Sequence, residues 1–314
     1  MRTRVAASVL RRTRQQRAQH AYARPPSFLR FAARPLIFAS GVTVAAYGGA
    51  GLLRQARAKR RRAERSTRFG SSAWRFPRGM HSAHPMLSAV LTSCENTANS
   101  PAFVGLGPLL GFNTLVFAGW QMATSGGPKL RAFMERHFLH QAFSPRLAPM
   151  VLACFSHSTF THFAFNMFAL NSFGKWVSAQ LGPENLVATY IAGGVWSSFG
   201  SMCFKYATMR ANPSLGASGS VIVLAASMAF VNPDARFALI FLPMFTFKAI
   251  HGIGAMAAFD SAGLLFRWSF LDHAAHLSAV GVAYGLTMLG GYRIAIEFQR
   301  SVVRAAEGGA AGRW

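Results

Sequence analysis

Apolar stretches about as long as a bilayer is thick alternate along this chain with short polar or basic connections. A helix needs about 20 apolar residues to cross the hydrocarbon core, where open backbone would leave its polar groups unsatisfied. Seven stretches approach this length, one isolated and six closely spaced: 35–53, then 102–128, 147–174, 185–204, 211–233, 237–266 and 273–292. The pattern predicts an all-α polytopic membrane protein. Lys248, His251 and Asp260 interrupt the 237–266 stretch and leave its helix boundaries open.

The composition agrees with lipid as the main solvent. Hydrophobic residues make up 52% of the 314 positions and charged residues 13%, whereas a soluble domain has roughly a quarter charged residues. A formal charge of +24 would also suit a nucleic-acid-binding protein. The basic residues, however, crowd the first 78 positions, and no basic motif interleaved with aromatic residues recurs downstream. We therefore expect no nucleic-acid partner.

The amino-terminal segment is rich in arginine and contains no acidic residue before Glu64. Its arginines are scattered among Ala, Ser and Gln, a composition typical of organellar transit peptides. No apolar run that would serve as a secretory signal precedes Pro35. We expect residues 1–33 to be a mitochondrial transit peptide; the alternative is a disordered basic tail on the cytosolic face of a membrane.

The further domain boundaries follow the same changes in composition. We expect residues 34–54 to form an extra amino-terminal transmembrane helix and residues 55–100 to form a basic and polar linker. Residues 101–295 then make up the membrane-embedded core, and residues 296–314 a short tail.

Small residues suggest how the helices pack. Cys94, Cys154 and Cys203 form neither a disulfide framework nor a CxxC pair, so we expect packing roles for them. Gly281 and Gly285 form a GxxxG pattern, which predicts close approach of a second helix.

Polar and ionisable side chains within membrane helices are costly and mark candidate functional sites. They gather here in three segments: SHSTFTHFAFNMF (156–168), PSLGASGS (213–220) and LDHAAHLSAVG (271–281). The three segments lie on the second, fourth and sixth predicted core helices. A site built from them would need the fold to bring distant parts of the chain together.

Ser218 and His276 are the candidate nucleophile and base. Gly216 and Gly219 leave space beside the Ser218 hydroxyl, and a helix start supplies free N–H groups for a developing oxyanion. Serine is a weak nucleophile without an adjacent base, which His276 would provide. The alternatives are a chance serine at a helix start and a histidine that bonds between helices.

His162 and Asn166 are spaced i, i+4 and therefore share one helical face. Side-chain N–H donors on a common face suit an oxyanion hole. The alternative is that both side chains form hydrogen bonds between helices.

Taken together, these motifs resemble those of the rhomboid family of intramembrane serine proteases. That family carries HxxxN, GxSG and an AH dipeptide in this order, as at His162 and Asn166, Gly216–Gly219, and Ala275 and His276. The runs SLGASG, FLPMFTF, DSAG and DHAAHL are similar to the mitochondrial presenilin-associated rhomboid-like branch, and RPLIFASGVTVAAYG is similar to the extra amino-terminal helix of that branch. The likeness covers about residues 34–290. It implies a six-helix rhomboid core preceded by one extra transmembrane helix.

The resemblance implies catalytic roles for two residues. Ser218 matches the nucleophile and His276 the general base of a Ser-His dyad, with Gly216 and Gly219 supporting the serine. No buried acid is expected to complete a triad. Asp272, one turn before His276, is expected only to cap its helix.

The resemblance also implies an oxyanion site. Asn166 and His162 match the oxyanion-binding pair, together with the backbone N–H of Ser218. His157 matches a further histidine at the mouth of the same helix.

Two positions depart from the family pattern. Ile222 stands where bacterial members often carry a tyrosine that stacks on the catalytic imidazole, so aliphatic packing would orient the base. Ala279 replaces the glycine of AHxxG, which loosens the expected contact between the two catalytic helices.

The function implied is a serine endopeptidase that cleaves transmembrane segments of single-span membrane proteins in the mitochondrial inner membrane, without cofactor or metal. Two alternatives stay open. One is a catalytically weak rhomboid-like binding or quality-control factor for membrane helices. The other is a metal-dependent hydrolase whose ligands come from His157, His162, His276 and Asp272. The substrate, the cleavage position, the membrane orientation and the oligomeric state stay open as well.

Overall fold

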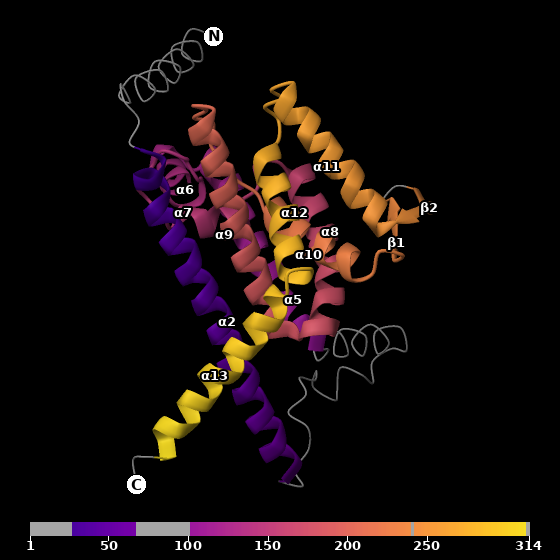
Figure 1. Ribbon diagram of the computed structural model, residues 1–314. Coiled ribbons are helices and arrows are strands. Elements are labelled where there is room, and N and C mark those ends of the chain that lie inside the picture. The colour runs from indigo at the N-terminus through magenta and orange to yellow at the C-terminus, as the bar shows by residue number, and fades with distance from the viewer. Residues whose placement is uncertain (1–26, 67–100, 240–241, 312–314) are drawn as a thin grey trace, which may run out of the picture.

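The computed structural model describes residues 27–66, 101–239 and 242–311. Most of the predicted transit peptide, most of the predicted linker, and Cys94 lie outside the described residues. The described part is predominantly helical, which confirms the predicted fold class (Figure 1). A two-stranded hairpin is the exception.

The first described helix, α2 (Phe28–Ser66), is longer than the apolar stretch that predicts it. It continues through the basic residues that follow Leu53, because Arg, Lys, Ala and Gln are all strong helix formers. The last helix, α13 (Gly291–Ala311), occupies residues expected to form a short tail. The two helices cross in Figure 1 and pack on each other.

A broken segment replaces the single helix expected over 147–174. It consists of α7 (Pro149–Leu152), the 3-10 turn η1 (Ala153–Phe155) and α8 (Phe160–Leu181). The break follows from Thr159, whose side chain accepts a hydrogen bond from the His162 N–H at 3.2 Å and so caps α8. Threonine and serine favour this capping position over a helix interior.

Two described helices lie between α2 and this break. The first, α5 (Pro101–Ser125), matches its predicted stretch closely. The second, α6 (Pro128–Phe138), was not predicted; it begins with a proline in its first turn, where the missing N–H costs nothing.

The centre of the molecule consists of α9 (Pro183–Ala207), α10 (Ser218–Val231) and α12 (His273–Thr287), which pack against one another. Glycines permit these contacts. A Cβ on Gly193 would lie 2.9 Å from a methyl group of Val223, and one on Gly200 would overlap the Ser278 side chain. The predicted GxxxG contact is wrong for the part of the chain that the structure describes, where a Cβ on Gly281 or Gly285 would have no neighbour within 4 Å.

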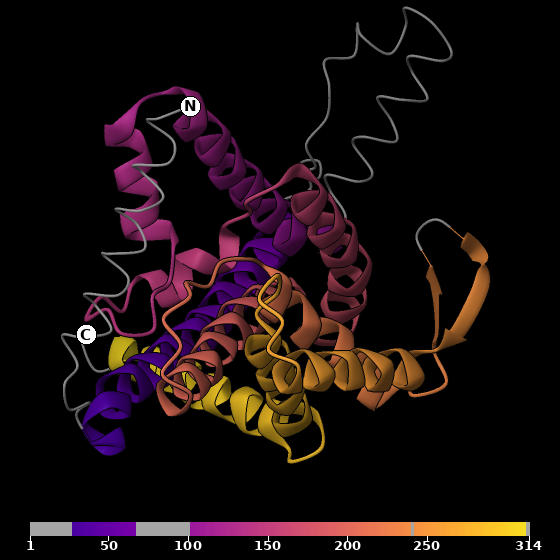
Figure 2. The same ribbon diagram turned by 90° about the horizontal axis from the view of Figure 1, so that it is seen from above.

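The 237–266 stretch is only partly helical. An antiparallel hairpin of β1 (Arg236–Leu239) and β2 (Leu242–Lys248) precedes α11 (Ala249–Leu265). Phe and Thr in FLPMFTF favour strands, and the proline opposes a helix interior. Figure 2 shows the hairpin standing away from the bundle, while α11 packs on α12.

Two of the described helices are both long and apolar enough to cross a membrane, over Phe28–Ala63 and Phe103–Ser125. The pair formed by α12 and α13 would add a third span if its 63° bend lies within the bilayer. The apolar helices α10 and α11 have 14 and 17 residues, short of about 20. The one-plus-six arrangement of spans therefore stays a prediction.

Candidate active site

Ser218 is the first residue of α10, where the helix leaves its first N–H groups without an acceptor of its own. The chain enters the helix through Gly216, whose φ of 135° is accessible to glycine and strained for other residues. The Gly216 N–H donates to the Ala153 carbonyl oxygen at 2.9 Å. This bond ties the loop before Ser218 to the 3-10 turn η1.

The structure brings Ser218 and His276 together from different helices. Ser218 Oγ and His276 Nε2 are 2.9 Å apart, although 58 positions separate the two residues in sequence. His276 is buried and Ser218 half-buried. Ser197 Oγ donates to the Ala275 carbonyl oxygen at 2.7 Å and so links α9 to the turn that carries His276.

The predicted oxyanion residues lie on α8 beside the same loop. A Cβ on Gly216 would be 2.9 Å from the His162 ring and 3.6 Å from Ser218 Oγ, so glycine is needed for the ring to lie here. Asn166 is buried, and its amide Nδ2 donates to the His162 carbonyl oxygen at 2.8 Å. In this state the Asn166 amide bonds within its own helix.

His157 is fully buried between the break and α8. Its ring lies edge-on to the ring of His162, with 5.1 Å between centroids, and also contacts Phe163. Neither ring nitrogen has a hydrogen-bond partner among the described residues. His157 thus supports the face of His162.

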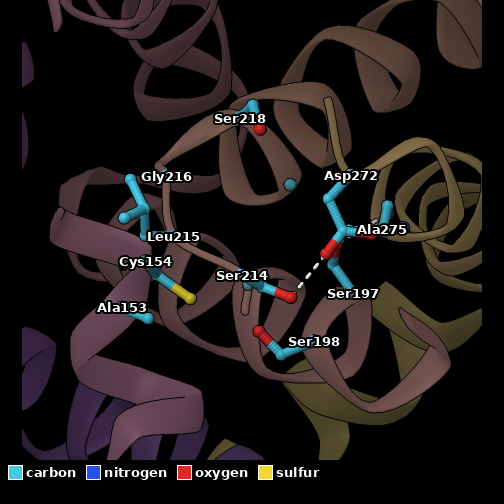
Figure 3. Close-up of a pocket in the computed structure, with 12 residues that line it drawn as sticks. Ala153, Cys154, Ser197, Ser198, Ser214, Leu215, Gly216, Ser218, Asp272 and Ala275 are labelled. Atoms are coloured by element: carbon cyan, nitrogen blue, oxygen red, sulfur yellow. Dashed lines mark hydrogen bonds between the residues drawn. The ribbon is translucent and has the colours of Figure 1, made fainter. Parts of the chain in front are cut away.

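A small cavity of about 20 Å³ lies beneath Ser218, enough for about one water molecule. Figure 3 shows Ser218, Cys154, Ser214 and Asp272 around it. Three of these side chains carry oxygen, so the cavity is polar on one side and bounded by the buried Cys154 on the other.

Asp272 ties the loop before Ser218 to α12. Its Oδ2 accepts from Ser214 Oγ at 2.5 Å, the dashed line of Figure 3, and from Lys205 Nζ at 2.8 Å. Its Oδ1 accepts from the Ala275 N–H at 3.2 Å, so the predicted capping role is confirmed. Burial raises the pKa of Asp272, but Lys205 and the hydroxyl donors outweigh burial and lower this pKa to about 2.

A fully buried carboxylate lies on the other side of His276, so the expectation that no buried acid accompanies the dyad is wrong. Asp260 of α11 is 1% exposed, and its Oδ1 lies 3.1 Å from His276 Nδ1 and 2.6 Å from His273 Nδ1. One signal was available in the sequence. An acid within an apolar stretch needs a partner, and Asp260 of DSAG is such an acid within the 237–266 stretch.

The two departures from the family pattern lie in one apolar cluster. Ile222 and Ala279 are buried with Ala283 at the contact of α10 with α12. Aliphatic side chains therefore occupy this contact. The ring of His276 has its polar neighbours elsewhere, at Ser218 and Asp260.

The metal hypothesis finds no geometric support within the described residues. No three His, Cys, Asp or Glu side chains there are grouped as ligands of one ion. Asp272, one of the four ligands considered, is bonded to Lys205.

Residues 144–292 match the Rhomboid domain. The chain is 36% identical over 183 residues to presenilin-associated rhomboid-like protein A, mitochondrial, of Danio rerio, covering 58% of this chain and 46% of the relative. It is 38% identical over 179 residues to presenilin-associated rhomboid-like protein, mitochondrial, of Homo sapiens, covering 57% and 45%. Rhomboid protein 1, mitochondrial, of Saccharomyces cerevisiae is 33% identical over 211 residues, covering 66% and 57%. The matches span about half the length of these relatives.

Proposed function

We propose that the protein is a rhomboid of the mitochondrial presenilin-associated rhomboid-like branch and a serine endopeptidase that cleaves transmembrane segments of membrane proteins. The match of residues 144–292 to the Rhomboid domain and the likeness to mitochondrial rhomboid proteins support this proposal. The observation that carries the proposal is the 2.9 Å distance between Ser218 Oγ and His276 Nε2. A nucleophile and a base at hydrogen-bond distance, brought together from separate helices, are what covalent catalysis requires.

Bond making and proton transfer in the proposed reaction involve these two side chains and a water molecule. Ser218 Oγ attacks the carbonyl carbon of the scissile peptide while its proton passes to His276 Nε2. The carbonyl electron pair moves to oxygen, and the resulting oxyanion collapses as Nε2 returns the proton to the leaving amine. Water then attacks the acyl-enzyme while His276 takes its proton, and His276 returns that proton to Ser218 Oγ as the bond to the acyl carbon breaks and the carboxylic acid product leaves.

We assign the oxyanion to the backbone N–H at the start of α10, with His162 and Asn166 as further donors. The proposal is supported by the position of the His162 ring against Gly216, next to Ser218. It requires the Asn166 amide to leave its bond to the His162 carbonyl oxygen when substrate binds. Catalytic hydrogen bonds often form only in the substrate complex.

The proposed location is the mitochondrial inner membrane, with single-span proteins as substrates. The relatives carry the word mitochondrial in their names, and the arginine-rich composition of residues 1–33 supports a transit peptide. The proposed protease core remains residues 101–295, with 34–54 as the extra helix. The structure adds that α13 packs along α2, beyond that core.

The proposal is tested by cleavage of a single-span reporter substrate in proteoliposomes. Ser218→Ala and His276→Ala should each abolish cleavage, and the double variant should be no worse, because residues that act as a unit are not additive. Ser220→Ala is the matched control: it removes a buried hydroxyl two positions along the same helix and should still cleave. Cleavage by folded Ser218→Ala protein would refute the proposal, and a protein that binds but never cleaves would favour the quality-control function.

Asn166→Ala tests the oxyanion assignment. Loss of one donor should lower kcat about 10²-fold with KM little changed, because other donors remain. His162→Ala should have a similar or smaller effect. Unchanged kcat in both variants, with chemistry rate-limiting, would return the two residues to a packing role.

A further inference from the structure

Asp260 lies deep in the bundle, where α11 packs on α12. Its carboxylate has no Lys or Arg partner among the described residues; its ion-pair partners there are the two histidines of DHAAH, His273 and His276. A buried charge is costly unless its neighbours satisfy it. Two imidazole N–H groups face Oδ1, while Oδ2 has no hydrogen-bond partner among the described residues, so the histidines are the groups that compensate this charge.

The bonding pattern sets which nitrogen of His276 carries the proton. An ionised carboxylate only accepts hydrogen bonds, so the Nδ1 atom that faces Asp260 must be the donor. A neutral imidazole that is protonated at Nδ1 has its lone pair at Nε2. That lone pair points to Ser218 Oγ at 2.9 Å, as a general base requires.

His273 holds the carboxylate from the other side. Its Nδ1 is 2.6 Å from Asp260 Oδ1, and its ring is enclosed by Phe259, Trp268 and Phe270. A Cβ on Gly263 would lie 2.5 Å from this ring. The glycine of DSAG therefore allows His273 to reach the aspartate one turn earlier on α11.

We propose that Asp260 is a positioning residue that completes a Ser218–His276–Asp260 relay, with His273 fixing the carboxylate. The inference rests on the proposed protease function and deepens it. When the Ser218 proton moves to Nε2, His276 becomes an imidazolium with a proton on each nitrogen. Asp260 keeps its negative charge and stabilises this cation; it takes up no proton, and the Nε2 proton later leaves with the amine.

The relay also accounts for Ile222. Without an aromatic side chain at that position, no ring supports the imidazole from α10, and the Ile222 side chain belongs to the apolar cluster between the helices. The carboxylate on α11 holds the imidazole by its Nδ1 atom instead. Orientation of the base is thus transferred from a stacking contact to a hydrogen bond.

Asp260→Asn and Asp260→Glu, purified as the full chain in proteoliposomes, test the proposal. The amide is nearly isosteric but uncharged, and it should lower kcat by about 10²–10⁴-fold with KM little changed. Glutamate keeps the charge and should retain more of kcat than asparagine, although it is the larger misfit. If Asp260 served packing alone, asparagine would be the better replacement. A higher kcat for Asp260→Asn than for Asp260→Glu would overturn the proposal. So would a loss of activity that only matches the unfolded fraction of each variant.

A measurement on the unmodified protein keeps the proposal testable if the variants fail to fold. ¹⁵N spectra of histidine-labelled protein, assigned with His276→Ala, should show Nδ1 of His276 protonated and Nε2 unprotonated at neutral pH. A His276 protonated at Nε2 alone would overturn the relay. The Ser218→Ala reaction separates the two claims: cleavage without Ser218 refutes the protease itself, whereas dead Ser218→Ala beside fully active Asp260→Asn refutes only the relay.

Discussion

Two carboxylates flank the first turn of α12, the half-buried Asp272 and the buried Asp260, and their partners differ in kind. Asp272 is held by the ammonium of Lys205 and the hydroxyls of Ser201 and Ser214. Asp260 is held by two imidazoles. The first set of donors keeps its protons throughout any reaction, while the second includes the group that we propose as the base.

The difference separates an acid that stabilises the fold, Asp272, from an acid that we propose affects catalysis, Asp260. Asp272 joins α9, the loop before Ser218 and the amino end of α12, so it fixes where the nucleophile and base lie. Asp260 contacts the imidazole ring itself, so it fixes how the base is protonated. Loss of the first should therefore appear mainly in stability, and loss of the second mainly in kcat.

The largest expected effect comes from Lys205→Met, which leaves the half-buried Asp272 without its cation. Removal of one partner of a buried ion pair typically costs about 3–5 kcal/mol. Lys205 is 3% exposed, so water cannot replace it. We expect a large fall in the unfolding midpoint, measured by thermal melts in detergent micelles.

The double variant Lys205→Met with Asp272→Asn is the control, because it leaves no uncompensated charge. It should recover much of the lost stability. If Lys205→Met melts like the wild type and instead lowers kcat, the distinction between the two acids is wrong.

A smaller effect is expected from acid. The pKa of Asp272 in the folded protein is about 2, below its ordinary value of 3.8. A depressed folded pKa means that the carboxylate stabilises the fold above pH 4 and that this contribution is lost between pH 4 and pH 2. The shift corresponds to about 2 kcal/mol. The stability difference between wild type and Asp272→Asn should shrink by that amount over this range; a constant difference would contradict the ion-pair account.

The smallest effects come from a matched pair of glycines. Gly263→Ala should press on His273 and disturb the Asp260 side of His276, slowing cleavage about tenfold, or 1.4 kcal/mol. Gly281→Ala lies on an exposed part of α12, where the added methyl group would meet none of the described residues within 4 Å, and it should change little. Equal rates for the two variants would show that His273 does not support the relay.

The helical class and the serine–histidine pair could be predicted from the sequence because each leaves a local mark. Apolar runs give the helices, and GxSG with AH marks the loop and helix start that carry Ser218 and His276. The break before α8 was missed because the polar residues that precede this helix, 156–159, contain no Asp, Glu, Lys or Arg and were treated as part of one span.

Asp260 was missed for a different reason. Its stretch, 237–266, was treated as one interrupted helix, so no register placed the acid against α12. In the structure the hairpin takes up the first part of this stretch, so the helix spans only Ala249–Leu265. These bounds place Asp260 on the helix face that contacts His273 and His276. The register of a short helix depends on tertiary contacts that periodicity in an all-apolar segment does not record.

The central claim is that Ser218 is a nucleophile activated by His276, and covalent labelling tests it most directly. A fluorophosphonate probe added to purified protein should form an adduct on Ser218, located by mass spectrometry of the peptide around GASGS. The adduct should be absent in Ser218→Ala and in folded His276→Ala, unchanged in Ser220→Ala, and unaffected by chelators. Labelling of Ser218 that proceeds equally well without His276, or cleavage activity that persists when Ser218 is fully blocked, would contradict the account.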